Sequence, residues 1–288
     1  MVLPKVLLTR TLPPESQQLI ENAKDIELIH WKDDIIPRDQ MLKLVPGVNG
    51  ILCMLTEKID SELLDIAGPN LKVVSTFSVG YDHVDLNELR KRKILLGNTP
   101  DVLTDATADI TALLVLAAAR RIREGIHAIE DGKWGKWGPV WMLGTQLTDK
   151  TVGIVGFGRI GEATARRLKP FLGENGKILY SGNNDKPMAV PLGAIKVEFN
   201  SLIRDSDIIS IINHDDLLRA LSEGLLGSVG LDVTAPESLE PDHPILKFQN
   251  VIVLPHIGSA TLETRTNMGN LAVENVLAGV RGQTLPRF

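Results

Sequence analysis

Two titratable side chains follow consecutive strand-like runs late in the chain, and their types could perform acid–base chemistry. Glu237 follows the run 230–233, and His256 follows the run 251–254 after a single proline. Neighbouring parallel strands would bring both side chains to the same edge of a sheet. A carboxylate favours the protonated form of a nearby imidazole. Such a histidine can give a proton to a carbonyl oxygen while hydride attacks the carbon.

A glycine motif supplies a partner for that chemistry. Residues 156–161 read Gly-Phe-Gly-Arg-Ile-Gly, directly after an apolar strand and before a helical run. This context is typical of the dinucleotide-binding fingerprint. Gly156 permits a tight turn, Gly158 lets the backbone approach a pyrophosphate, and Gly161 lets helix and strand pack closely. The N–H groups at the start of the helix face the phosphates.

The residues about 20 positions after the fingerprint bear on the choice of nucleotide. An acidic residue there would bind the ribose of NAD, but the strand ends at Ser181 and continues as Gly-Asn-Asn-Asp-Lys. Ser181, Asn183 and Lys186 could donate hydrogen bonds to a 2′-phosphate, whereas Asp185 would repel it. The sequence therefore favours NADP(H), with NAD(H) as the alternative.

A third candidate feature lies in the first third of the chain. Residues 78–82 read Ser-Val-Gly-Tyr-Asp and follow the strand-like run 73–76. Gly80 could let backbone N–H groups converge on an anion such as a carboxylate, although a plain turn also fits this pattern. No Cys/His pair has the spacing of metal ligands, so we expect no metal site.

Alternating strand and helix patterns must position these groups. Short β-rich runs alternate with helical runs through most of the chain, which predicts an α/β fold. One block runs to about residue 102, and a second begins at Thr151. Between them we expect one long helix, 104–124, too apolar to be a solvated connector. A further helix, 261–280, could return the chain to the first block.

Three of the four tryptophans lie in the glycine-rich stretch 132–144, at Trp134, Trp137 and Trp141. A packed loop and an arm that reaches a second subunit both fit this composition, since tryptophan is enriched at interface anchors.

Composition excludes several classes of protein. The 288 residues carry a net charge of −5 and no clustered basic stretch, which argues against nucleic-acid binding. One cysteine, Cys53, excludes an internal disulfide framework and fits a reducing compartment. No apolar run reaches the ~18 residues of a membrane span, and the N-terminus lacks the pattern of a signal peptide. We therefore expect a cytoplasmic protein.

Taken together, these motifs resemble the D-2-hydroxyacid dehydrogenase family, and within it the glyoxylate/hydroxypyruvate reductase group. The resemblance runs through nearly the whole chain, and its landmarks are jointly specific. They are the segments 78–82 (SVGYD), 98–102 (NTPDV), 155–161 (VGFGRIG), 230–237 (GLDVTAPE) and 254–261 (LPHIGSAT).

The resemblance implies a role for each landmark. His256 is the proton donor and Glu237 its partner, while the Val79 and Gly80 amides, His256 and Ser259 bind the substrate. The residues expected to contact the nucleotide are Gly156, Gly158, Arg159, Ile160, Gly161, Asp232 and Gly258. Ser181, Asn183 and Lys186 are expected at its 2′-phosphate. The family pattern further implies a homodimer, with the helix near 106–121 in the subunit contact, and no membrane or nucleic-acid partner.

One departure from the family pattern concerns the catalytic arginine. The family carries it in an Asn-x-Ser-Arg-Gly stretch, on a strand between those matching 208–212 and 228–233. Here the intervening residues match only the helix after that strand. One helix–strand unit of ~30 residues is therefore absent, with the join inside 210–213. Arg219 belongs to the following helix and is no substitute, and Arg159 or Arg265 would serve only in a shifted fold.

The loss has a predictable size, because the arginine would bind the substrate through two charge-assisted hydrogen bonds. Losing two hydrogen bonds of ~1.5–3 kcal/mol each corresponds to a loss of ~10²–10⁴-fold in the binding of the substrate. Three hypotheses follow: an NADPH-dependent reductase of hydroxypyruvate and glyoxylate, a nucleotide-binding protein without turnover that partners a full-length subunit, or a shortened chain that folds poorly.

We expect two Rossmann-like domains with doubly wound parallel sheets. Residues 1–102, completed by 262–288, would bind the substrate, and residues 103–261 would bind the nucleotide.

Overall fold

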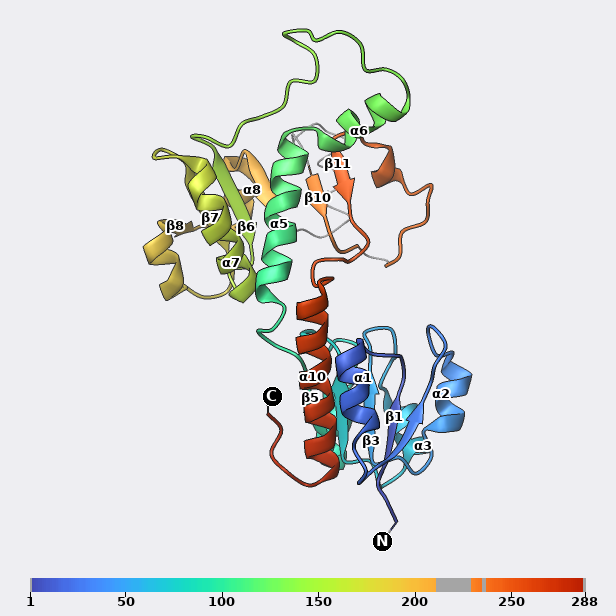
Figure 1. Cartoon of the computed structure of the whole chain (residues 1–288). Coiled ribbons are helices and arrows are strands. Elements are labelled where there is room, and N and C mark those ends of the chain that lie inside the picture. Colours follow the sequence, from blue (N-terminus) through green and yellow to red (C-terminus); the bar gives the residue numbers. More distant parts are fainter. Residues whose placement is uncertain (1, 211–228, 235–236, 287–288) are drawn as a thin grey trace. The chain divides into compact units, whose positions relative to one another are not determined.

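The computed structural model describes residues 2–210, 229–234 and 237–286. The chain divides into two compact units, which we describe separately (Figure 1). The first unit spans Met1–Leu103 and Ala260–Phe288, and the second spans Thr104–Ser259. The C-terminal segment thus belongs to the same unit as the N-terminal segment.

The first unit contains a five-stranded parallel sheet in the order β2-β1-β3-β4-β5. Its elements are β1 (Lys5–Leu8), α1 (Pro14–Glu21), β2 (Glu27–His30), α2 (Arg38–Leu44), β3 (Gly50–Cys53), α3 (Ser61–Ala67), β4 (Val73–Thr76), α4 (Leu86–Arg92), β5 (Leu95–Gly97) and α10 (Leu262–Val280). The strand order reverses between β1 and β3, the place where open α/β sheets tend to bind ligands.

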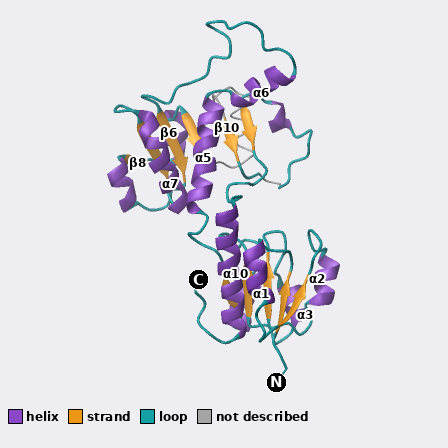
Figure 2. Cartoon of the chain, in the orientation of Figure 1, coloured by secondary structure: helices purple, strands orange, loops and turns teal. Residues whose placement is uncertain are grey.

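Helix α10 covers this sheet together with α1, and Figure 2 shows the two helices side by side. The packing is close, because a Cβ added at Gly279 would lie 2.4 Å from Cβ of Val73 on β4. The Ser75 hydroxyl donates to the Ala272 carbonyl over 2.8 Å, which ties β4 to α10. The C-terminal helix therefore completes the core of the first unit.

The second unit holds two parallel sheets, ordered β8-β7-β6-β9 and β10-β11. Its elements are α5 (Thr104–Ala119), α6 (Ile122–Glu130), β6 (Thr151–Val155), α7 (Arg159–Leu168), η1 (Lys169–Leu172), β7 (Lys177–Ser181), η2 (Pro187–Leu192), β8 (Ala194–Lys196), α8 (Phe199–Asp205), β9 (Ile208–Ser210), β10 (Val229–Leu231), η3 (Pro244–Lys247) and β11 (Val251–Val253). These parallel sheets with flanking helices confirm the predicted α/β class.

The sheet of the second unit is divided between β9 and β10. Within the described residues no ladder joins these two strands, and the sequence predicts the loss of a helix–strand unit at this place. Helix α5 packs against β9, β10 and β11 and so bridges the two sheets. A Cβ added at Gly230 on β10 would lie 2.7 Å from Cβ of Leu114 on α5. Arg219 and most of the expected join lie outside the described residues.

The prediction of a single helix over 104–124 was wrong, because the structure has two helices there. Helix α5 ends at Ala119, Arg121 has a left-handed φ of 56°, and α6 starts at Ile122. A hydrogen bond from a later segment explains the break, because the Thr145 amide donates to the Ala119 carbonyl over 2.8 Å. In an uninterrupted helix that carbonyl would accept from the amide of residue 123.

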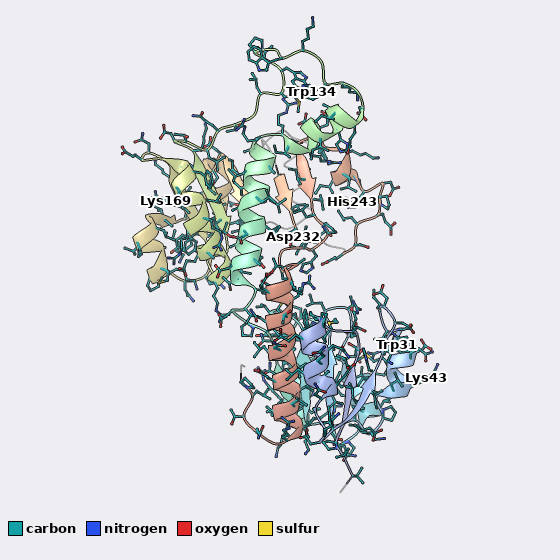
Figure 3. All side chains as sticks on the ribbon, viewed as in Figure 1. Trp31, Lys43, Trp134, Lys169, Asp232 and His243 are labelled. Atoms are coloured by element: carbon teal, nitrogen blue, oxygen red, sulfur yellow. The ribbon has the colours of Figure 1, made fainter. Side chains whose placement is uncertain are left out.

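The tryptophan-rich segment after α6 extends away from the sheets of its unit, as Figure 3 shows at Trp134. Trp134, Trp137 and Trp141 are all exposed, so the packed-loop interpretation does not hold within this chain. In the part of the chain that the structure describes, no helix is long and apolar enough to cross a membrane, and no group of side chains could hold a metal ion.

Candidate active site

His256 and Glu237 lie beyond the carboxyl ends of the paired strands β11 and β10. The His256 Nδ1 and Glu237 Oε1 atoms are 2.6 Å apart, the proximity that the sequence suggested. Both side chains remain partly exposed, at 35% and 47%, so a ligand can reach the imidazole. With Nδ1 held by the carboxylate, Nε2 is the nitrogen left to exchange a proton with a ligand.

Asp232, one residue beyond β10, fixes the backbone around this histidine (labelled in Figure 3). Its carboxylate oxygens accept from the Ile257 amide over 2.8 Å and the Gly258 amide over 2.7 Å. Its carbonyl accepts from the His256 amide over 2.9 Å. His256 has a left-handed φ of 53°, a conformation that persists only where the surroundings impose it. These three bonds impose it.

The three fingerprint glycines at the carboxyl end of β6 serve three different physical needs. Gly156 has a φ of +87°, which favours glycine. A Cβ at Gly161 would lie 2.1 Å from the Gly156 carbonyl oxygen, so helix α7 could not approach the strand. Gly158 has an ordinary φ of −83° and nothing within 4 Å of an added Cβ. Neither conformation nor packing requires glycine there, so the open space fits a pyrophosphate.

The neighbouring residues complete a site that fits a dinucleotide. Helix α7 begins at Arg159, which is exposed, and continues through the half-buried Ile160. The first N–H groups of a helix have no intrahelical acceptor and carry partial positive charge. The Gly156 amide donates to the Ser181 carbonyl over 2.9 Å, so the turn after β6 and the end of β7 are joined.

The end of β7 shows how the polar residues expected near the ribose are arranged. Ser181 is buried, Asn183 is exposed, and the Lys186 amide donates to the Tyr180 hydroxyl over 3.1 Å. Asp185, the acid that counted against a 2′-phosphate, is 3.3 Å from Nζ of Lys196 on β8. Lys196 was missed from the sequence, because only strand pairing brings β8 beside β7.

The remaining candidate residues lie at two other places. Val79 is half-buried and Gly80 exposed just beyond the carboxyl end of β4 in the first unit. Ser259 is buried at the end of the second unit, and a Cβ at Gly258 would lie 2.6 Å from the Asp232 carboxylate. The structure thus brings Glu237, Asp232, His256 and Gly258 together, and separately the fingerprint and the end of β7.

A close histidine–glutamate pair and a dinucleotide fingerprint in one α/β unit are typical of a nucleotide-dependent oxidoreductase. The family model described as D-isomer specific 2-hydroxyacid dehydrogenase, catalytic domain, matches residues 6–287. The chain belongs to this family of NAD(P)-dependent dehydrogenases, as the motifs indicated.

Named relatives agree with this assignment. The glyoxylate reductase/hydroxypyruvate reductase of Mus musculus is 42% identical, over 98% of this chain and 96% of the relative. A crystal structure of a protein from Thermus thermophilus has a TM-score of 0.88 and 35% identity, covering 98% of this chain and 99% of that one. The NADPH-dependent glyoxylate/hydroxypyruvate reductase of Sinorhizobium meliloti, solved with citrate, has a TM-score of 0.76 and 28% identity, covering 96% and 94%.

The comparison with the mouse protein also bears on the absent segment. That alignment extends over 318 positions, although this chain has only 288 residues. At least 30 aligned positions, the difference of the two numbers, therefore have no residue here. This number supports the loss of one helix–strand unit, and the division between β9 and β10 is where that unit would lie.

Proposed function

We propose that this protein reduces hydroxypyruvate to D-glycerate and glyoxylate to glycolate with NADPH. The observation that carries the proposal is the contact of 2.6 Å between His256 and Glu237, in a unit that also carries the fingerprint glycines. The names of the mouse and Sinorhizobium relatives support the choice of substrates.

Each of the chain's own groups has a defined task in this reaction. The nicotinamide nucleotide, when bound, supplies the hydride for the carbonyl carbon. His256 Nε2 gives its proton to the carbonyl oxygen, and Glu237 stabilises the imidazolium before transfer. Asp232 keeps the His256 backbone in place, and the Val79 and Gly80 amides bind the substrate carboxylate.

The division of labour between the two units follows the same proposal. The first unit, 1–103 and 260–288, binds the oxo acid. The second unit, 104–259, binds the nucleotide through Gly156, Gly158, Arg159, Ile160, Gly161 and Gly258. NADP(H) is preferred because Ser181, Asn183 and Lys186 meet a 2′-phosphate, while Lys196 offsets the charge of Asp185.

The direct test is the loss of NADPH absorbance with purified protein and either hydroxypyruvate or glyoxylate. We expect turnover with both acids, a higher kcat/KM with NADPH than with NADH, and loss of turnover in His256→Gln. Turnover that survives in His256→Gln with an unchanged pH profile would contradict the assignment.

A second candidate is a nucleotide-binding protein without turnover, and the absent arginine segment favours it. It predicts that NADPH binds with a measurable Kd while neither oxo acid is reduced. Co-purification with a full-length homologue would support this alternative. Turnover by the isolated chain at about 1 s⁻¹ or faster, the low end of common enzyme rates, would exclude it.

The exposed apolar side chains after α5 support a homodimer. Ile122, Ile126 and Ile129 of α6 are exposed, and Trp137 in the following loop is 85% exposed. The three isoleucines share one face of the helix by their spacing, and exposed apolar patches mark interaction sites. Light scattering should give twice the 31.5 kDa of one chain, and Ile129→Glu with Trp137→Ser should shift it toward the monomer. The buried, unpaired Cys53 supports a cytoplasmic location.

A further inference from the structure

Three consecutive carbonyl groups beyond β4 are held by hydrogen bonds from polar groups nearby. The Ser78 carbonyl accepts from the Thr99 amide over 2.8 Å. The Val79 carbonyl accepts from Asn98 Nδ2 over 2.9 Å, and the Gly80 carbonyl accepts from the Ser78 hydroxyl over 2.6 Å. Two of these three donors are side chains, and each could be removed by mutation.

Anchored carbonyls determine where the following N–H groups point. In a trans peptide the C=O and N–H bonds lie in one plane and point in opposite directions. The N–H groups of Val79, Gly80 and Tyr81 are therefore turned away from the groups that hold the carbonyls. Among the residues that the structure describes, none of these three N–H groups has an acceptor.

The space at Gly80 is open, which fits the approach of a ligand. Its φ is outside the left-handed region, and nothing lies within 4 Å of an added Cβ. Glycine is thus required here neither by backbone conformation nor by packing. Successive N–H groups that face open space form a concave site for an anion.

The anchors are themselves fixed by buried groups. Asn275, fully buried on α10, donates from Nδ2 to the Asn98 carbonyl over 3.0 Å. On the other side, the Ser78 hydroxyl donates its proton to the Gly80 carbonyl. Its oxygen therefore accepts a hydrogen bond from the Thr76 hydroxyl, 2.7 Å away. Thr76 in turn accepts from Nε2–H of His83 over 3.0 Å. Each hydroxyl has one proton, so the direction of this chain of bonds is determined.

We propose that Ser78 and Asn98 are positioning residues that orient the Val79, Gly80 and Tyr81 amides toward the carboxylate of a 2-oxo acid. The identity of that ligand rests on the proposed function, whereas the orientation rests on the bonds above. Asn98 controls the peptide group that ends in the Gly80 amide. Ser78 controls the one that ends in the Tyr81 amide, a third donor that the sequence did not indicate.

Selective isotope labelling can observe both amides directly. Valine precedes glycine only at Gly80, Gly153, Gly156 and Gly230, so labels on valine carbonyl carbon and glycine nitrogen give four signals. Tyrosine occurs only at 81 and 180, so ¹⁵N-tyrosine gives two. Oxalate, a carboxylate that cannot be reduced at a ketone, serves as the probe. We expect saturable shifts at Gly80 and Tyr81, while Gly153 and Tyr180 within strands stay unchanged.

Variants then separate the two anchors. Asn98→Ala should weaken oxalate binding about tenfold, the effect of losing ~1.4 kcal/mol, and reduce the Gly80 shift. Ser78→Ala should reduce the Tyr81 shift, and Ser78→Thr, which keeps the hydroxyl, should restore it. Asn98→Asp keeps the shape without a donor and covers the case in which Asn98→Ala does not fold.

Asn49→Ala is the matched control, because Asn49 Nδ2 also donates to a backbone carbonyl, that of Asn70, over 3.1 Å before β3. This variant should leave both signals and the KM for hydroxypyruvate unchanged. In Asn98→Ala that KM should rise about tenfold with the Kd for NADPH unaltered.

The outcomes distinguish this proposal from the proposed function. Two results would overturn the positioning role even if the protein reduces oxo acids. One is that oxalate shifts neither the Gly80 nor the Tyr81 signal of the wild type. The other is that Asn98→Asp and Ser78→Ala both bind oxalate with wild-type affinity. Shifts that these variants abolish, in a protein that reduces no oxo acid, would support the positioning role and contradict the proposed function.

Discussion

The Asp232 carboxylate lies 2.7 Å from the amide nitrogen of Gly258, close enough that a Cβ on this glycine would lie 2.6 Å from the same carboxylate oxygen. The other carboxylate oxygen accepts from the preceding amide, that of Ile257. One side chain from the end of β10 therefore fixes the peptide groups that follow His256. This arrangement makes Asp232 a positioning residue as well as an expected nucleotide contact.

Asp232→Ala should lower the free energy of unfolding by about 1–3 kcal/mol, because two N–H groups lose their acceptor. It should also lower kcat about tenfold or more, since 1.4 kcal/mol of misplacement corresponds to that factor. Asp232→Asn keeps one acceptor oxygen, so its unfolding free energy and its kcat should lie between those of Asp232→Ala and the wild type. Urea denaturation and steady-state kinetics measure both effects. Asp205→Ala, which removes only an exposed pair with Arg204, is the control and should change neither quantity.

His256→Gln should lower kcat/KM by about 10²–10⁴-fold, the usual contribution of a general acid, with the Kd for NADPH unchanged. Glu237→Gln should have a smaller effect, because the amide still reaches Nδ1 of His256 but carries no negative charge. The control is His127→Gln on α6, where His127 and Glu130 form another His–Glu pair at 3.3 Å. Equal losses in His127→Gln and His256→Gln would argue against a specific role.

Two alanine substitutions in the glycine fingerprint should separate folding from binding. Gly161→Ala places a Cβ 2.1 Å from a backbone carbonyl and should destabilise the protein by about 1–3 kcal/mol. Gly158→Ala meets nothing within 4 Å, so its unfolding free energy should stay within about 0.5 kcal/mol. Its Kd for NADPH should rise about tenfold. Calorimetric titration would contradict this prediction if Gly158→Ala bound NADPH as tightly as the wild type.

Lys196→Ala should weaken NADPH binding about threefold to tenfold, because the charge of Asp185 would no longer be offset near the 2′-phosphate. NADH binding should be unaffected, and Asp185→Asn should restore the affinity of Lys196→Ala for NADPH. The matched control is Lys150→Ala, which breaks an ion pair of the same 3.3 Å length with Asp207 at the opposite end of the sheet. If Lys196→Ala weakened NADH binding as much as NADPH binding, Lys196 would not act through the 2′-phosphate.

Stability should fall on acidification through His83. Burial lowers the pKa of the His83 imidazole below its ordinary 6.5, against smaller opposing effects of Glu57 and Asp82. The unfolded chain therefore binds a proton at higher pH than the folded one. The stabilisation is complete above pH 6.5 and is lost as the pH falls through the lower folded pKa. The difference in unfolding free energy between about pH 7.5 and pH 5.5 should be smaller in His83→Gln than in the wild type. An equal difference in the two proteins would contradict this prediction.

Local patterns were enough to predict the α/β class, most strands and the chemistry at their ends. The fingerprint could be read because its glycines, strand and helix are adjacent in the sequence, and each glycine has a local physical reason. His256 and Glu237 could be paired because consecutive parallel strands end at the same edge. The loss of a helix–strand unit could also be predicted, since the arginine landmark of the family pattern is missing between two others, and the 318-position alignment supports this prediction.

Contacts between distant residues decided the rest. Arg120 and Arg121 are good helix formers, so only the bond from Thr145 to Ala119 reveals where α5 ends. The offset of Asp185 by Lys196 depends on the pairing of β7 with β8. The orientation of the Gly80 amide depends on Asn98, almost twenty residues away in sequence. The order of residue types along the chain was enough to pair groups at adjacent strand ends, such as His256 and Glu237. Partners from separate segments, such as Lys196 for Asp185 and Asn98 for Val79, became known only from the fold, because hydrogen bonds and ion pairs depend on distance in space.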